Sequence, residues 1–365
     1  NADTLLKQTA PNGSSFHPTL RMSAALLTQY GESLENIQVA NDLKVQMPEG
    51  PQVLLKVLSS SLNPLDNEMR KGYARSIVSL RPEQQMPMIL GRDCVGEVVH
   101  VGNDVWDYRV GDRVWAANAP FSNGTHAQYV VMNESDIARS PANLSDTQAA
   151  SVPFAALTAW NAIFNTANIT SGMRVLVNGA NGGVGFFSVN LLKKHLGCIV
   201  GATCQRHNFD KIQKAGADIL IDYTDSTSSS LRPDVNNKFD VVLNCVDGGA
   251  AMQEKCISWL RPGGHYVSFN GPLVRDSDKE GVLIGLSRGV LDQNLKQKAH
   301  ADSIKTSNSL FVPSSSTLRR ITKMFEDNLL QTNVGQVFPL ANIKDGYQCY
   351  MDGRSNGKIV FDHRS

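Results

Sequence analysis

The sequence predicts an α/β protein in two parts, a β-rich first region followed by a region built on a parallel β-sheet. Short apolar stretches broken by turn-forming residues run from residue 20 to residue 131. After Ala149, helical patterns alternate with short apolar stretches. The chain has 365 residues, which exceeds the roughly 250–300 residues at which a single core stops growing efficiently. We therefore expect two domains.

The first region has the pattern of antiparallel strands, because its apolar stretches are separated by Gly and Asn-Gly turns. The strands expected there cover residues 53–58, 96–102, 111–116 and 127–131. The second region has the pattern of βαβ units, in which helices connect the strands of a parallel sheet. The strands expected there cover residues 175–177, 199–202, 219–221, 241–243 and 266–269.

The last hundred residues are less regular. Residues 271–313 are polar and predict an excursion or a flexible connection, and a helix is expected over 318–330. Strand-like stretches at 337–340 and 358–361 could rejoin the first region. The predicted organisation is a first domain over 1–150, a second domain over 151–312, and a segment over 313–365 that returns to the first domain.

Composition excludes several classes of protein. The 35 basic side chains balance 34 acidic ones, so no nucleic-acid partner is expected. No apolar run approaches the roughly 20 residues that cross a bilayer, so no transmembrane segment is expected. The six cysteines form no CxxC pair, which favours reduced thiols, as in the cytosol or the mitochondrial matrix. Asn1 as first residue is compatible with a removed transit peptide, and the sequence leaves this open.

A glycine-rich turn follows the expected strand at 175–177. Gly179, Gly182 and Gly185 have the spacing of a variant dinucleotide fingerprint, in which backbone N–H groups at a helix start receive a diphosphate. The alternative is a tight turn without a ligand. The candidate cofactor-binding residues of this turn are Gly179, Asn181, Gly182, Gly183 and Val184.

The end of the next strand favours NADP over NAD. NAD-binding proteins usually carry an acidic residue there for the ribose hydroxyls, whereas this chain has Gln205 and Arg206. A guanidinium can bind the 2′-phosphate of NADPH through paired hydrogen bonds. Arg206 is alternatively a solvated residue at a helix start, and Lys211 is a weaker candidate for the phosphate.

Several segments together resemble the medium-chain dehydrogenase/reductase superfamily over most of the chain. They are residues 61–66 (SLNPLD), 90–96 (LGRDCVG), 111–117 (GDRVWAA), 148–160 (QAASVPFAALTAW), 216–218 (GAD), 221–223 (IDY) and 353–360. The resemblance implies a GroES-like catalytic domain at 1–150 and a doubly wound Rossmann NADP-binding domain at 151–312.

Within this superfamily the chain resembles the zinc-free quinone oxidoreductase branch. Zinc-dependent relatives bind the catalytic metal through a Cys in the first motif and a Gly-His-Glu in the second. This chain has Asn63 and residues 91–93 (Gly-Arg-Asp) at those places and no cysteine quartet for a structural zinc. No metal site is therefore expected. Without a Lewis acid, hydride transfer requires an acceptor activated by conjugation, such as a quinone or an enone.

The resemblance also implies roles for individual residues. Asn63 and Tyr73 line the substrate cleft, although Asn63 is alternatively an ordinary turn residue and Tyr73 a packing residue. Thr158 and Phe269 lie against the nicotinamide, Tyr223 against the adenine and Asn244 near the ribose, although packing explains Phe269 as well. Arg354, Asn356 and Lys358 reach the adenosine phosphate from a neighbouring loop, and their alternative is plain solvation at the surface. Gln205 replaces a Ser of the relatives, which leaves its contact with the 2′-phosphate open.

The function expected from these observations is zinc-independent, NADPH-dependent reduction of a quinone or a similar conjugated carbonyl. Similarity to mitochondrial members of the branch implies the mitochondrial matrix, with the cytoplasm as the alternative, and a link to ubiquinone metabolism. A homodimer and a mitochondrial protein partner are compatible with the sequence, which leaves both open. Two other functions stay open. One is reduction of 2-alkenals or enoyl thioesters, and the other is that of a non-catalytic NADPH-binding assembly partner.

Overall fold

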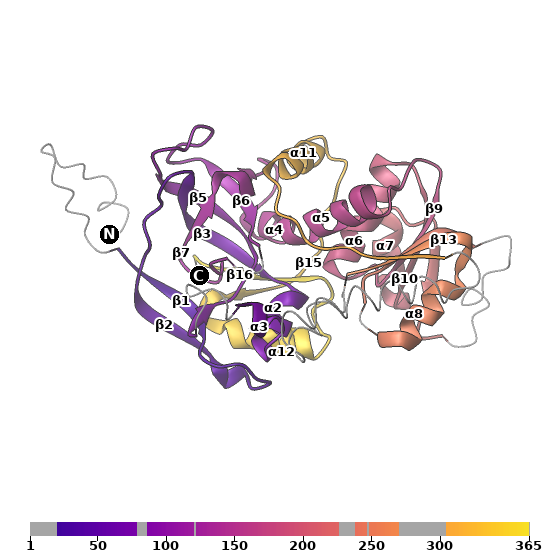
Figure 1. Ribbon diagram of the computed structural model, residues 1–365, viewed down its shortest axis with the longest axis horizontal. Coiled ribbons are helices and arrows are strands. Elements are labelled where there is room, and N and C mark those ends of the chain that lie inside the picture. Colours follow the sequence, from indigo (N-terminus) through magenta and orange to yellow (C-terminus); the bar gives the residue numbers. More distant parts are fainter. Residues whose placement is uncertain are drawn as a thin grey trace, which may run out of the picture.

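Two β-sheet regions lie side by side in the computed structural model, with helices between and around them (Figure 1). The structure describes residues 20–78, 86–119, 122–225, 238–246, 248–269 and 304–364. The β-rich region carries both the start and the end of the described chain, and the parallel sheet lies at the opposite end of the molecule.

The β-rich region contains a seven-stranded sheet and a three-stranded sheet. The larger sheet has the order β15 (Val334–Pro339), β16 (Lys358–Asp362), β3 (Gln52–Leu62), β5 (Asp93–Val101), β6 (Arg113–Ala117) and β8 (Ile137–Arg139), and β7 (Tyr129–Asn133) also pairs with β3. The smaller sheet has the order β2 (Ile37–Lys44), β1 (Arg21–Leu27) and β4 (Met88–Ile89). Strand β16 runs antiparallel to β3, with Phe361 opposite Ser60. The C-terminal segment therefore returns to the first region, as its apolar stretches predicted.

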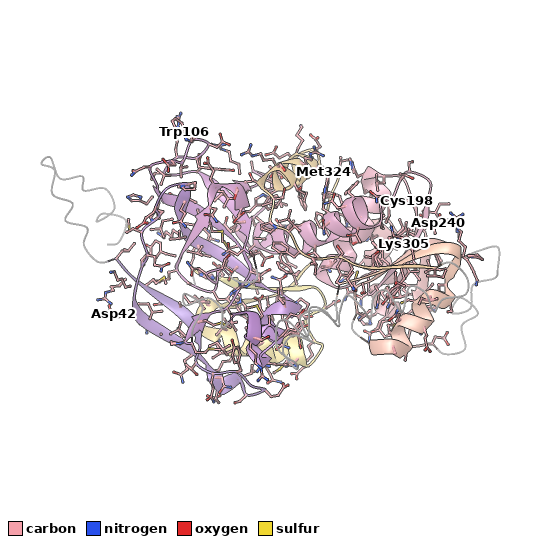
Figure 2. The ribbon with its side chains drawn as sticks, in the orientation of Figure 1. Asp42, Trp106, Cys198, Asp240, Lys305 and Met324 are labelled. Carbon is pink, nitrogen blue, oxygen red and sulfur yellow. The ribbon has the colours of Figure 1, made fainter. Side chains whose placement is uncertain are left out.

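The second region is a parallel sheet of six strands. Its order is β11 (Ile219–Asp222), β10 (Ile199–Cys204), β9 (Arg174–Asn178), β12 (Phe239–Asn244), β13 (Leu260–Ser268) and β14 (Lys305–Asn308). The chain proceeds outward from β9 in both directions, which makes the carboxyl end of β9 a switch point where ligands of such sheets bind. Cys198, Asp240 and Lys305, at or beside strand starts, lie at the outer end of the molecule (Figure 2). The carboxyl ends consequently face the β-rich region.

Helices of both regions begin and end at residues suited to those positions. They are α2 (Pro64–Lys71), α3 (Arg75–Val78), α4 (Asp146–Ala150), α5 (Pro153–Trp160), α6 (Gly183–Asn190), α7 (Phe209–Ala215), α8 (Gly249–Ser258), α11 (Ser315–Glu326) and α12 (Ile343–Met351). Ser145 and Ser314 cap α4 and α11 by accepting a hydrogen bond from a backbone N–H of the first turn. Gly72 ends α2 in the left-handed conformation that glycine adopts without strain.

One apolar core joins the two regions. Trp115 of β6 meets Phe325 of α11 edge to face with ring centroids 6.0 Å apart, and Phe187 of α6 lies 6.1 Å from the same ring. Met324 of α11, labelled in Figure 2, belongs to this core and lies over the junction. Burial of these large side chains is worth about 1.5–3 kcal/mol each, so the core holds the sheets in a fixed relation.

The structure confirms the predicted class, an antiparallel β-rich region together with a parallel α/β region. The expected strands are present, most of them a few residues longer than their apolar cores. Strand β14 was not expected, because its sequence Lys-Thr-Ser-Asn is polar and belonged to the segment interpreted as a connection. The remainder of that segment, residues 271–303, lies outside the described residues. The domain boundaries at 150 and 312 stay predictions.

Two histidines that share the Ser60 hydroxyl as a hydrogen-bond partner make stability depend on pH. The Ser60 hydroxyl lies 2.9 Å from Nδ1 of His126 and 2.9 Å from Nε2 of His363. Burial lowers the pKa of His126 well below 6.5 and that of His363 to about 4. Both imidazoles are neutral in the folded protein and take up protons on unfolding. The contribution of each is complete above pH 6.5 and decreases as the pH falls below that value, for His363 until about pH 4.

We expect His363→Gln to reduce the slope of the free energy of unfolding against pH between pH 6.5 and 4. The variant lacks this imidazole, which contributes at most about 1.4 kcal/mol per pH unit. Urea unfolding of both proteins across this range measures the difference. The opposing contribution of Asp66, whose pKa burial raises to about 6, is common to both proteins and cancels. Equal slopes for variant and wild type would show that His363 does not stay neutral in the folded state.

Candidate active site

The glycine turn connects β9 to α6 at the switch point. Two of its glycines are required by the conformation and packing of the protein itself. Gly179 has φ of +84°, which a residue with a side chain adopts only with strain. A Cβ at Gly185 would lie 2.2 Å from the Gly179 carbonyl oxygen, so Gly185 allows α6 to approach the turn closely. These two glycines fix the shape of the turn.

The other two glycines differ from each other. A Cβ at Gly183 would lie 2.8 Å from Cδ of Lys358, so this position is occupied by the lysine side chain. A Cβ at Gly182 would meet nothing closer than the Gly179 oxygen at 3.6 Å, and Gly182 is exposed. The protein itself therefore does not require glycine at 182. A ligand that approaches the backbone at the start of α6 does require it, and the positive end of the helix favours a diphosphate there. The turn fits a dinucleotide.

A series of hydrogen bonds between buried side chains holds the backbone of the turn. The Thr203 hydroxyl accepts a hydrogen bond from Gly179 N at 2.9 Å and donates one to Asn178 Oδ1 at 2.7 Å. Asn178 Nδ2 donates to Asn244 Oδ1 at 2.8 Å, and Asn244 Nδ2 donates to the Tyr266 hydroxyl at 2.9 Å. The network ties together the carboxyl ends of β9, β10, β12 and β13. Asn244 was predicted as a site residue, whereas Asn178, Thr203 and Tyr266 were missed.

Candidate residues for the adenosine half lie at the ends of β10 and β11. Gln205 and Arg206 are exposed directly after β10, and the Arg206 guanidinium lies over the Phe209 ring at 5.9 Å from its centroid. Tyr223 follows β11 and is 49% exposed. Because β10 and β11 are paired in parallel, with Cys204 opposite Asp222, both candidates lie at the same edge of the sheet.

A polar cluster brings the C-terminal loop to the glycine turn. Asn181 Nδ2 donates to Asn356 Oδ1 at 3.3 Å, and Asn333 Nδ2 donates to the Asn181 carbonyl at 2.8 Å. The Lys211 ammonium donates to Asn356 O and Oδ1, both at 3.1 Å, and to Asn333 Oδ1 at 3.2 Å. Asn181 Oδ1 is buried without a partner among the described residues. The predicted residues Asn181 and Asn356 are brought together here, and Asn333 was missed.

The resemblance implied that Arg354 and Lys358 reach the adenosine phosphate from one loop. In the structure their side chains make other contacts. The Arg354 guanidinium forms an exposed ion pair with Asp352 at 2.6 Å. Lys358 is only 6% exposed, and burial lowers the pKa of its ammonium. Its Nζ donates to the Leu62 carbonyl at 2.9 Å and to Asn63 Oδ1 at 2.6 Å. Lys358 thus extends from the glycine turn to the predicted substrate cleft, not to the adenosine end.

Asn63 lies at the centre of a buried polar cluster. It is 2% exposed, and its Nδ2 donates to Asp93 Oδ1 at 2.9 Å. Asp93 Oδ1 also accepts from the Ser61 hydroxyl at 2.6 Å, and Asp93 Oδ2 accepts from Phe154 N at 3.1 Å. Since Phe154 lies in the first turn of α5, Asp93 connects the β-rich sheet to that helix. Asp93 as a structural partner of Asn63 was not predicted.

A second carboxylate, that of Asp66, is also bonded to this cluster. Asp66 accepts from Asn63 N at 2.8 Å and from Gly91 N at 3.1 Å, and Arg92 Nε lies 3.5 Å from its Oδ1. Burial raises the pKa of Asp66 to about 6, against the opposing effect of Arg92. Asn63 is therefore bonded to Asp93, and Arg92 is paired with Asp66. Within the described ranges, no three His, Cys, Asp or Glu side chains form a group that could hold a metal.

The remaining candidates lie on α5, after β13 and after α2. Thr158 is buried in α5, and its hydroxyl donates to the Phe154 carbonyl at 2.7 Å. Phe269 follows β13, half-buried against the apolar core that joins the regions. Tyr73 follows α2, half-buried against a separate apolar cluster. No helix among the described residues is both long and apolar enough to span a membrane.

The fold and the turn define a nucleotide-dependent oxidoreductase of the dehydrogenase type, and comparison with known proteins agrees. Residues 49–142 match the alcohol dehydrogenase GroES-like domain, and residues 215–361 match the zinc-binding dehydrogenase family. The mitochondrial NAD(P)H oxidoreductase RTN4IP1 of Dictyostelium discoideum is 46% identical, with 94% of this chain and 100% of that protein aligned. The human protein of the same name is 30% identical over 93% of this chain and 89% of its own length.

A solved structure shows the same architecture. The quinone oxidoreductase from Coxiella burnetii superposes with a TM-score of 0.78 at 26% identity, over 94% of this chain and 99% of that one. The chain belongs to the medium-chain dehydrogenase/reductase superfamily and, within it, to the RTN4IP1 family of NAD(P)H oxidoreductases. This confirms the predicted superfamily and the GroES-like and Rossmann-like architecture.

Replacing Gly182 should separate cofactor binding from folding. We expect Gly182→Val to raise the Kd for NADPH by at least about tenfold, because the new side chain occupies the face open to a diphosphate. The melting temperature should stay near that of wild type, since φ at Gly182 is −73° and its surroundings are open. Calorimetric titration with NADPH and thermal melting measure the two effects.

Gly185→Ala is the matched control. Its methyl group would lie 2.2 Å from the Gly179 oxygen, so the melting temperature should fall. A stable Gly185→Ala protein together with a Gly182→Val protein that still binds NADPH as wild type does would contradict the assignment of the two glycines.

Proposed function

We propose that this chain is an NADPH-dependent oxidoreductase that reduces a quinone or a similarly conjugated carbonyl without zinc. Membership of a family of NAD(P)H oxidoreductases supports a nicotinamide cofactor. The quinone oxidoreductase from Coxiella burnetii, similar over nearly the whole of both chains, supports the class of acceptor. The preference for NADPH rests on the end of β10, where Gln205 and Arg206 stand in place of a carboxylate.

The main support for the proposal is the contact between Lys358 and Asn63. Lys358 fills the space beside Gly183 at the start of α6, and its ammonium binds Asn63, which follows the neighbouring strand β3. Polar hydrogens are thereby available within one side-chain length of the turn that fits a diphosphate. Thr158 and Phe154 on α5 border the same junction. A nicotinamide and an acceptor oxygen can therefore meet beside these donors.

The chain's contribution to the reaction follows from these positions. Overall, a quinone, NADPH and one proton give a hydroquinone and NADP⁺, and the bound cofactor supplies the hydride. The negative charge that develops on the acceptor oxygen requires a hydrogen-bond donor and a proton, which solvent can supply. Asn63 is the donor at the junction, and the Lys358 ammonium holds its amide oxygen. The apolar core that joins the two regions keeps them in a fixed orientation.

Zinc independence is proposed from the residue types at the cleft. Asn63, Arg92 and Asp93 occupy the positions where zinc-dependent relatives have Cys, His and Glu. An amide and a guanidinium are not the N and S ligands that zinc prefers. Arg92 is in addition held by Asp66 and by the carbonyl oxygens of Ala119 and Ser122.

An acceptor panel tests the proposed function. Purified protein should oxidise NADPH faster with small quinones than with 2-alkenals or enoyl thioesters, because hydride addition to a quinone produces an aromatic hydroquinone anion. Turnover is followed by NADPH absorbance, with and without a zinc chelator. The reverse ranking would assign the chain to alkenal or enoyl reduction. Tight NADPH binding without turnover on any acceptor would assign it to a non-catalytic role.

Arg206→Ala tests the choice of cofactor. We expect the Kd for NADPH to rise about 10- to 100-fold, because a charged hydrogen bond to the 2′-phosphate is lost, while the Kd for NADH stays unchanged. Titration of both cofactors measures this. Arg319→Ala removes another exposed arginine, which pairs with Asp107 away from the turn, and should change neither constant. Equal losses for NADPH and NADH in Arg206→Ala would remove the 2′-phosphate role.

Localisation in the mitochondrial matrix, a homodimer and a mitochondrial protein partner belong to the same proposal. Two relatives described above are named mitochondrial, and the reduced thiols expected from the sequence suit the matrix. Protease protection in fractionated mitochondria tests the compartment, and sedimentation of the purified protein tests the dimer. Signal in the cytosolic fraction alone would favour the cytoplasmic alternative.

A further inference from the structure

The Asn63 side chain lies between two opposite charges. Its Nδ2 donates to the Asp93 carboxylate at 2.9 Å, and its Oδ1 accepts from the Lys358 ammonium at 2.6 Å. An amide turned by 180° would place its oxygen against the carboxylate and its N–H groups against the ammonium. Both contacts would then be repulsive. The two charges therefore select one orientation of the amide.

Both charged groups are themselves held in place. Asp93 accepts further hydrogen bonds from the Ser61 hydroxyl at 2.6 Å and from Phe154 N at 3.1 Å. Lys358 donates to the Leu62 carbonyl at 2.9 Å, and its stem lies against Gly183. Asp93 and Lys358 are buried, so water does not replace these contacts. Neither end of the arrangement is free to relax.

The amide keeps a donor that the described residues do not use. Nδ2 carries two protons, and Asp93 Oδ1 is its one acceptor among the residues that the structure describes. Hydrogen bonds arranged in series polarise one another, and a carboxylate at one end and an ammonium at the other strengthen this effect. The second N–H is consequently a fixed and polarised donor at the junction of the two regions.

We propose that Lys358 and Asp93 are positioning residues that fix the Asn63 amide so that its second N–H donates to the acceptor oxygen, an inference that rests on the proposed function. The negative charge on that oxygen grows during hydride transfer. A donor set in advance stabilises the charge without reorganising at that moment. Lys358 acts through Asn63, and its effect should appear in kcat and not in the affinity for the cofactor.

A double-mutant cycle tests this coupling. Lys358→Met removes the charge and the donor but keeps a stem of similar length against Gly183. We expect kcat to fall about tenfold, as for a lost hydrogen bond to a developing charge, with the Kd for NADPH unchanged. Asn63→Ala should lower kcat at least as much, and the double variant should fall no further than Asn63→Ala alone. Lys323→Met, which removes an exposed lysine paired with Asp327, should leave both constants unchanged.

Independent losses that multiply in the double variant would overturn the inference. A Lys358→Met protein with a raised Kd for NADPH and an unchanged kcat would also overturn it, since Lys358 would then act on the cofactor. Should Lys358→Met not fold, Asp93→Asn offers the same test from the other end of the amide. It should lower kcat without additivity to Asn63→Ala.

A spectroscopic measurement separates this inference from the proposed function. The side-chain amide of Asn63 is identified in ¹⁵N-asparagine-labelled protein by its absence in Asn63→Ala. Its two protons should exchange slowly in the wild type with bound NADP⁺ and faster in Lys358→Met, because one restraint on the orientation is lost. Unchanged exchange would overturn the positioning role. If wild type reduced none of the acceptors, the proposed function would fail while this measurement still decided how the amide is held.

Discussion

The contact between Lys358 and the turn at Gly183 is the constraint on which the rest of the site depends. It exists because the C-terminal segment returns across the molecule and inserts β16 between β15 and β3. Lys358 is the first residue of that strand, so its side chain leaves the β-rich sheet at the edge that faces the parallel sheet. The missing side chain at Gly183 makes room for it. A single lysine thereby connects the nucleotide turn to Asn63.

Four buried charges surround this contact, and their balance explains why it is stable. Arg92 and Lys358 are positive, while Asp66 and Asp93 are negative, and all four are buried. An isolated buried charge costs several kcal/mol, but here backbone groups and side chains satisfy each of them. Asp66 binds two backbone N–H groups, and Lys358 binds a backbone carbonyl. Such a network holds its members in one geometry, which is the property that a hydride-transfer site requires.

Much of the fold could be predicted from the sequence, because apolar stretches and glycine spacing are local signals. The turn at Gly179 to Gly185 and the return of residues 358–361 to the first region are examples. The polar strand β14 could not, since Lys305 to Asn308 pair with β13 through the backbone and carry no apolar pattern. Thr203 and Asn178 were missed because their hydrogen bond depends on which strands are neighbours. The burial of Lys358 depends on the path of β16, and its charge alone suggested the surface.

In the complex with NADPH, the diphosphate should lie on the open face of Gly182 while Lys358 stays with Asn63. A crystal structure of the NADPH complex tests it most directly. We expect the diphosphate within hydrogen-bond distance of the amides at the start of α6, the nicotinamide beside Thr158, and the Lys358 ammonium still on Asn63 Oδ1. A nucleotide bound elsewhere, or a Lys358 that has left Asn63 for the diphosphate, would contradict it.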